Sequence, residues 1–343
     1  MTLIDLSGEI PDDPFAWLLD AWAEGRWTAR DSAAEAVAGW DVQAVDVAGR
    51  PGWVLRRPAM PGEAVHGSGE AFLGPDLNGR SRLLINRETN GAAGVDLAYL
   101  NVPFIWSDSG WSLSIDTGAP VLMDLSDVYT VLVLDPHATF HTTMGSPAEI
   151  LREHTARTGR APTWPDWAYG VWMSRATYLS ADEMAAVVAD LRAADCPVDV
   201  SHVDAWMTGN VFRDFTTNWE VDRDRFPVGW TDRLREAGAR VSMWLNPFVH
   251  ADTELAAGLH AHGLLLRMPD GSPATTCDRA YRNLVDFTNP AAVQWWQEQI
   301  VDLVASERPD ALKLDFAEEV PPDAITHDGR PALLVRNSYA TLY

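Results

Sequence analysis

The residues of this chain whose types and spacing best suit chemistry lie in one short stretch, residues 310–321. This apolar run carries Lys313 and Asp315 two positions apart and ends in Glu318 and Glu319 before a proline. Such a run predicts a buried strand that delivers a carboxylate to an open edge, as at a catalytic strand end. Taken alone, such a stretch is more often an acidic loop after an ordinary strand.

Three earlier runs of the same kind also end in polar or aromatic side chains. In a barrel of parallel strands the active groups come from the carboxyl ends of several strands, so a shared edge is a stronger signal than any single motif. The residues at the four predicted strand ends are Ser174 and Arg175, Asp204, Trp244 and Asn246, and Asp315 and Glu318.

The elements that must position these residues alternate after Trp164. Apolar strands are expected at residues 169–174, 198–206, 240–245 and 311–316, and helices lie between them. Ser180 and Glu183 form a predicted capping box at the start of the first helix, and Asn289-Pro290 starts the last one. Apolar strands linked by helices predict a parallel sheet covered on both faces. No glycine-rich loop follows the first strand, which argues against nucleotide binding.

The first half of the chain has a different pattern. Short strand-like runs at residues 82–86, 102–106, 111–115 and 128–134 are broken by turn residues, and Asp108-Ser109-Gly110 is a hairpin signal. This texture predicts an antiparallel β-sandwich. A helix over residues 146–158 and a proline-rich segment follow, so we expect one domain over residues 1–158 and a second over 159–343.

Composition excludes several classes of function. The 343 residues carry a net charge of -23, and no segment concentrates lysine and arginine, so binding to nucleic acid or to an anionic membrane is not expected. The start shows no signal peptide, and no long uncharged apolar stretch follows, which predicts a soluble, cytoplasmic protein. Cys196 and Cys277 are expected to be free thiols. The 16 tryptophans suit a site for a ring-shaped polar ligand, although most are expected in the core.

From about residue 64 onward the chain resembles glycoside hydrolase family 31, the retaining α-glycosidases that include α-glucosidases, α-xylosidases and sulfoquinovosidases. Each matching string is weak alone, and their order makes the resemblance specific. The strings are Gly69-Glu70, Tyr99-Leu100-Asn101-Val102-Pro103-Phe104, Tyr169-Gly170-Val171-Trp172, His202-Val203-Asp204-Ala205-Trp206, Phe226-Pro227, Trp244-Leu245-Asn246-Pro247, Asp286-Phe287-Thr288-Asn289-Pro290 and Lys313-Leu314-Asp315-Phe316-Ala317-Glu318.

The resemblance implies a (β/α)8 barrel that hydrolyses a terminal α-glycosidic bond of an oligosaccharide or glycoside, with no cofactor and no metal. It makes Asp315 the nucleophile, and the neighbouring Lys313 would favour the ionised carboxylate. It also implies that Asp204 bonds sugar hydroxyls, that Lys313 binds sugar, and that Trp244 lines the pocket. The alternatives are a capping role for Asp204, a structural ion pair for Lys313 and a core position for Trp244.

Two departures from the family bear on function. Ala317 stands where the family often has glycine, and Arg336-Asn337 replaces a common His-Asn pair. The sequence therefore does not decide which sugar the glycone is. The stretch from Pro165 onward is shorter than the roughly 250 residues of a complete barrel. We therefore expect the N-terminal portion of such an enzyme, with the first four barrel strands and without the acid/base residue, and possible homo-oligomerisation of the full-length enzyme. The alternative is a non-catalytic carbohydrate-binding or partner-assembled fragment.

Overall fold

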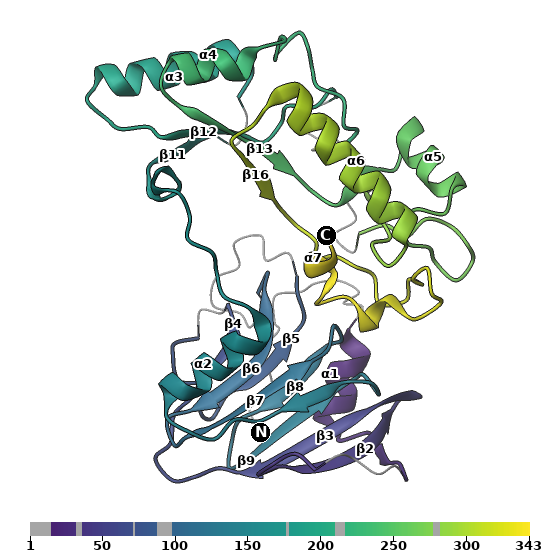
Figure 1. Ribbon diagram of the computed structural model, residues 1–343. Coiled ribbons are helices and arrows are strands. Elements are labelled where there is room, and N and C mark those ends of the chain that lie inside the picture. The colour runs from purple at the N-terminus through teal and green to yellow at the C-terminus, as the bar shows by residue number, and fades with distance from the viewer. Residues whose placement is uncertain are drawn as a thin grey trace. The chain divides into compact units, whose positions relative to one another are not determined.

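The computed structural model describes residues 15–31, 36–70, 73–87, 98–175, 178–209, 217–276 and 282–343. The chain forms two compact units (Figure 1). Unit 1 contains residues 1–160, 318–325 and 329–342, and unit 2 contains residues 161–317 and 326–328 together with Tyr343.

Unit 1 is built from two antiparallel sheets. The strand order is β1-β2-β3-β9-β8-β5 in the six-stranded sheet and β10-β7-β6-β4 in the four-stranded sheet. The elements are α1 (Ala16–Ala23), β1 (Thr28–Ala29), β2 (Asp41–Val47), β3 (Arg50–Pro58), β4 (Val65–Gly69), β5 (Ser81–Leu84), β6 (Asn101–Ser107), β7 (Trp111–Asp116), β8 (Val121–Asp124), β9 (Val128–Val133), β10 (Thr139–His141), α2 (Pro147–Thr158), the 3-10 helix η2 (Ala332–Leu334) and α7 (Tyr339–Leu342).

Side chains from both sheets of unit 1 share one core. Leu55 and Val131 of the larger sheet pack in the same cluster as Ile105 and Leu113 of the smaller sheet. The two sheets therefore form a sandwich, and all four runs predicted as strands in this half are strands. The predicted hairpin turn joins β6 to β7.

Unit 2 contains a parallel sheet with the strand order β11-β12-β13-β16. A small antiparallel pair, β14 and β15, lies in the connection between β13 and α6. The elements are the 3-10 helix η1 (Asp166–Tyr169), β11 (Trp172–Ser174), α3 (Ala181–Ala193), β12 (Val200–Val203), α4 (Trp230–Glu236), β13 (Arg240–Leu245), β14 (Phe248–His250), α5 (Glu254–Ala261), β15 (Arg282–Leu284), α6 (Pro290–Glu307) and β16 (Ala311–Leu314).

Three helices cover one face of this sheet. Met184 of α3, Leu234 of α4 and Leu303 of α6 share a core cluster with Val241 and Met243 of β13. The prediction of helices on both faces is not what the described residues show, because α3, α4 and α6 all pack into this single cluster. The opposite face carries His202, Ser242, Trp244 and Lys313.

Several local predictions in unit 2 need correction. The strand predicted at residues 198–206 is limited to Val200–Val203. The first strand is shorter than expected, because Tyr169 ends a 3-10 helix and only Trp172–Ser174 pairs with β12. The capping box of α3 is half formed: Ser180 accepts a hydrogen bond from the Glu183 amide, but the Glu183 carboxylate accepts from the Leu179 amide instead.

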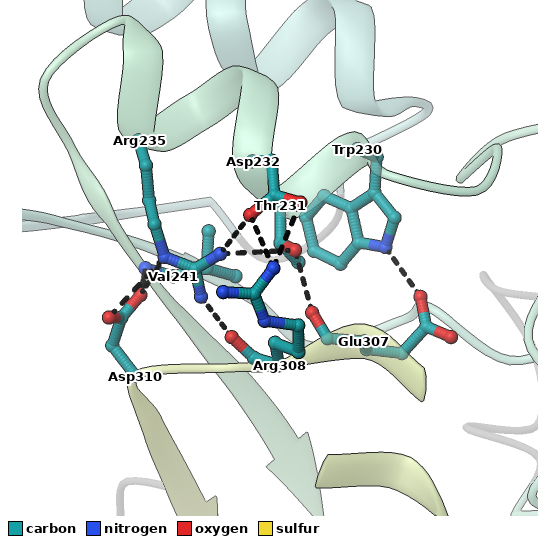
Figure 2. A network of polar contacts seen from close by, with 8 residues as sticks. All are labelled: Trp230, Thr231, Asp232, Arg235, Val241, Glu307, Arg308 and Asp310. Carbon is teal, nitrogen blue, oxygen red and sulfur yellow. Dashed lines mark hydrogen bonds and ion pairs between the residues drawn. The ribbon is translucent and has the colours of Figure 1, made fainter. Parts of the chain in front are cut away.

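The start of β16 is fixed by a polar network between α4, α6 and β13 (Figure 2). The Asp310 carboxylate accepts hydrogen bonds from the Val241 amide at 2.9 Å and from Arg235 Nε at 3.2 Å, and the Arg235 guanidinium also bonds Asp232. The Thr231 hydroxyl donates to the Glu307 carbonyl at 2.6 Å. These contacts set the register in which β16 enters the sheet.

Candidate active site

The parallel register brings the predicted site residues to one face of the sheet. His202 lies opposite Ser242, and Trp244 lies opposite Lys313. Side chains alternate between faces along a strand, so these four residues lie on the face opposite Val203, Met243 and the covering helices.

Asp315 continues this pattern one step beyond β16. Its amide donates to the Leu245 carbonyl at 2.9 Å, so the backbone of β13 still holds it in the ladder. Its carboxylate oxygen Oδ2 accepts a hydrogen bond from Trp244 Nε1 at 2.8 Å and lies 3.0 Å from Lys313 Nζ. Two of the predicted binding residues therefore hold the predicted nucleophile directly.

Asp204 joins the same network from β12. Lys313 Nζ lies 3.8 Å from Asp204 Oδ1 as well as 3.0 Å from Asp315, so one ammonium group bridges two carboxylates. The structure thus brings together all four of the residues singled out from the sequence. Lys313 keeps a half-exposed side chain, whereas Trp244 is 4% exposed.

The surroundings of Asp315 favour its ionised form. Burial raises the pKa of this carboxyl, but the hydrogen bonds from the Trp244 indole and from Lys313, together with the lysine charge, outweigh burial and hold the pKa below its usual value. The carboxylate is therefore ionised at neutral pH, as a nucleophile must be.

The chain turns sharply directly after Asp315. Phe316 and Ala317 both adopt left-handed backbone conformations, with φ of 64° and 90°. This region disfavours residues with a Cβ atom and suits glycine, so Ala317 stands at a position with a conformational cost. The Phe316 ring packs edge-on against Trp244 with centroids 6.0 Å apart, and it lies under the Arg282 guanidinium.

His202 and Ser242 are not among the site residues predicted from the sequence. His202 Nε2 lies 2.7 Å from Asp204 Oδ1, and Nδ1 lies 2.9 Å from the Ser242 hydroxyl. The available signal was weak: Ser242 is the one polar residue in the run 241–245, and His202 stands two positions before Asp204.

Other polar residues at the predicted strand ends are engaged elsewhere. Arg175 pairs with Glu183, and Asn246 is buried, where its carbonyl oxygen accepts from Thr217 and from the Phe248 amide. Ser174 bonds the Arg175 carbonyl. These residues support the loops around the site and make no contact with the two carboxylates.

Three further sequence expectations concern the rest of the chain. Cys196 is a free, exposed thiol, whereas Cys277 lies outside the described residues. No group of three or more His, Cys, Asp or Glu side chains within the described ranges is arranged to hold a metal ion. In the same ranges, every helix is too short or too polar to cross a bilayer.

Comparison with known proteins agrees with the geometry of this sheet. Residues 161–343 match the model of the glycosyl hydrolases family 31 TIM-barrel domain. An alpha-xylosidase of Emericella nidulans is 33% identical over 298 residues, which cover 82% of this chain and 37% of that protein. The alpha-xylosidase XylQ of Lactiplantibacillus pentosus is 28% identical, with coverage of 82% and 38%. The chain therefore spans little more than a third of the length of these relatives.

Solved structures share the fold at lower identity. The cycloalternan-degrading enzyme from Trueperella pyogenes, in complex with isomaltose, superimposes with a TM-score of 0.77 at 20% identity, and the match covers 92% of this chain and 52% of that one. Because the family model matches more than half of its residues, this chain belongs to glycoside hydrolase family 31.

Proposed function

We propose that the chain provides the nucleophile and part of the sugar pocket for hydrolysis of terminal α-glycosidic bonds, in an α-glucoside or an α-xyloside. The observation that carries this proposal is the ionised Asp315 at the end of a parallel strand, held by Trp244 and Lys313. Two α-xylosidases among the relatives support the α-xyloside in particular.

In this proposal Asp315 attacks the anomeric carbon while the bond to the leaving-group oxygen breaks, which gives a covalent glycosyl-enzyme intermediate. Asp204 accepts hydrogen bonds from sugar hydroxyls, Lys313 donates to them, and Trp244 lines the glycone pocket. Water then hydrolyses the intermediate, so the anomeric configuration is retained.

A retaining mechanism needs a second carboxyl group about 5–5.5 Å from the nucleophile to protonate the leaving group. Asp204 is poorly suited to this task, because His202 and Lys313 both contact its Oδ1 and keep it as an acceptor. We propose that the acid/base residue comes from outside these 343 residues.

The test is covalent trapping with 5-fluoro glycosyl fluorides of the α-gluco and α-xylo series. Fluoride leaves without strong acid catalysis, so the reagent reports on the nucleophile even where the acid/base residue is lacking. We expect a single label on the peptide that contains Asp315, detected by mass spectrometry. Asp315→Asn should abolish the label. Asp302→Asn, the same change at an exposed position of α6, should leave it unchanged.

The outcomes separate the two functions considered. A label that persists in Asp315→Asn contradicts the nucleophile assignment. A chain that binds methyl α-D-xyloside or methyl α-D-glucoside but is never labelled is instead a non-catalytic carbohydrate-binding module.

A further inference from the structure

A chain of three side chains runs from the buried sheet to the candidate site. The Ser242 hydroxyl lies 2.9 Å from His202 Nδ1, and His202 Nε2 lies 2.7 Å from Asp204 Oδ1. Ser242 is fully buried and His202 is 6% exposed, so water cannot replace these contacts. Both residues sit on adjacent parallel strands in direct register.

The same three residue types form the nucleophilic triad of serine hydrolases, but this arrangement cannot work in that way. In a triad the serine bonds Nε2 and the carboxylate bonds Nδ1, and the serine oxygen is open to substrate. Here the two ring nitrogens have exchanged partners, and Ser242 has no exposed surface. The serine therefore acts on the imidazole and not on a substrate.

The two oxygens of Asp204 differ in their surroundings. Oδ1 faces both His202 Nε2 and Lys313 Nζ, the latter at 3.8 Å. Oδ2 has no hydrogen-bond partner among the residues that the structure describes, and the side chain is 18% exposed. One oxygen is thus held by protein, while the other remains able to accept from a ligand.

We infer that Ser242 and His202 are positioning residues that select the orientation of Asp204. The buried Ser242 hydroxyl donates to Nδ1, which fixes the neutral tautomer with its proton on Nε2. That proton binds Asp204 Oδ1 and turns Oδ2 toward a hydroxyl of the ligand. The identity of the ligand as a sugar rests on the proposed function, whereas the tautomer and the carboxylate orientation do not.

The chain offers a matched pair of variants. Ser242→Ala removes the proposed donor. Ser201→Ala makes the same change at an equally buried serine of β12 that lies on the opposite face of the sheet, one residue before His202. His202→Gln assigns the ring signals by their loss and keeps a side-chain amide that can donate toward Asp204.

The first readout is the ¹⁵N NMR spectrum of the histidine rings in the full chain at neutral pH, together with the ¹³C carboxyl signal of Asp204. We expect a neutral His202 ring protonated on Nε2. Ser242→Ala should shift the tautomer ratio and the Asp204 carboxyl signal, and Ser201→Ala should shift neither.

The second readout is binding of methyl α-D-xyloside, followed by chemical-shift titration. We expect Ser242→Ala to bind about five- to tenfold more weakly, which corresponds to one net hydrogen bond, and His202→Gln to retain more affinity than His202→Leu.

A His202 ring protonated on Nδ1, or spectra that Ser242→Ala leaves unchanged, would overturn the inference, whatever the result of the methyl α-D-xyloside titration. If the expected tautomer and carboxyl shifts are found but Asp315 is never labelled by the fluoride reagents, the positioning role stands and the proposed hydrolysis fails.

Discussion

Glu307 offers the sharpest test of how α6 and β16 are held in place. Its side chain is 2% exposed at the end of α6. The carboxylate accepts hydrogen bonds from both Arg223 terminal nitrogens, at 2.7 and 3.1 Å. It also accepts a hydrogen bond from Trp230 Nε1 at 3.0 Å (Figure 2). We predict that Glu307→Gln destabilises the protein, because either orientation of the new amide places its NH₂ group against a donor.

The expected loss of stability follows from the burial of Glu307 and the partial exposure of Arg223. Breaking a fully buried ion pair costs about 3–5 kcal/mol. The Arg223 side chain is 46% exposed, so water recovers part of its hydration, and we expect a loss of about 2 kcal/mol. For a unit of this size that corresponds to a fall in Tm of about 4–8 °C.

The same substitution should show a defined dependence on pH. Burial raises the pKa of Glu307, but the bonds from Arg223, Trp230 and Ser306 outweigh it and hold the pKa below its usual value. A carboxyl with a lowered folded-state pKa stabilises the fold above its unfolded value of about 4.3, and this contribution is lost as the pH falls through the folded value. The gap between wild type and Glu307→Gln should therefore be full at pH 7 and shrink below about pH 4.

The assay is urea unfolding followed by tryptophan fluorescence at pH 7 and at several acidic values. Glu298→Gln is the matched control, because Glu298 lies exposed on the same helix and bonds only Gln294 among its described neighbours. We expect its effect to stay within about 0.5 kcal/mol. Equal effects of the two substitutions at pH 7 would refute the reasoning.

Three further predictions concern the site and unit 1. Trp244→Phe removes the indole donor to Asp315, so the carboxyl pKa should rise in a ¹³C titration, and the stability that the ionised carboxylate contributes should be lost at a higher pH. Ala317→Val should lower the unfolding free energy by roughly 2–3 kcal/mol because a β-branched residue cannot adopt φ near 90°, whereas Ala317→Gly should stay within about 1 kcal/mol, since relief of strain offsets loss of a buried methyl group. Ser146→Ala removes the cap of α2, where Ser146 and Glu149 form a complete capping box, and should cost about 1 kcal/mol in thermal unfolding.

The grouping of the four site residues could be predicted from the sequence because parallel strands bring their carboxyl ends to one edge. Asp204 and Trp244 lie near the carboxyl ends of apolar runs, and Lys313 lies two positions before Asp315 on the same run, which is enough to place all three near Asp315. The direct contacts of these side chains with Asp315 could not be predicted, because they depend on the register between β13 and β16. Only the pairing of Trp244 with Lys313 brings the indole within 2.8 Å of the carboxylate.

Other features are only weakly signalled by the residue pattern. His202 and Ser242 look like ordinary polar interruptions until the register sets them opposite each other. The shortened first strand follows from a 3-10 turn that ends at Tyr169, which periodicity cannot distinguish from a strand. The left-handed backbone conformation of Phe316 and Ala317 could not be predicted either, because neither residue type favours it.

The composition of unit 1 has a consequence for the order in which the protein can fold during synthesis. Leu333 belongs to the core that α1 and the larger sheet share, and Asn337 donates to the Leu84 and Ala119 carbonyls. These residues leave the ribosome after strands β11, β12, β13 and β16 of unit 2. The sandwich therefore cannot complete its packing until residues 161–317 have been translated. A clone that ends near residue 160 would express the sandwich without Leu333 and Asn337.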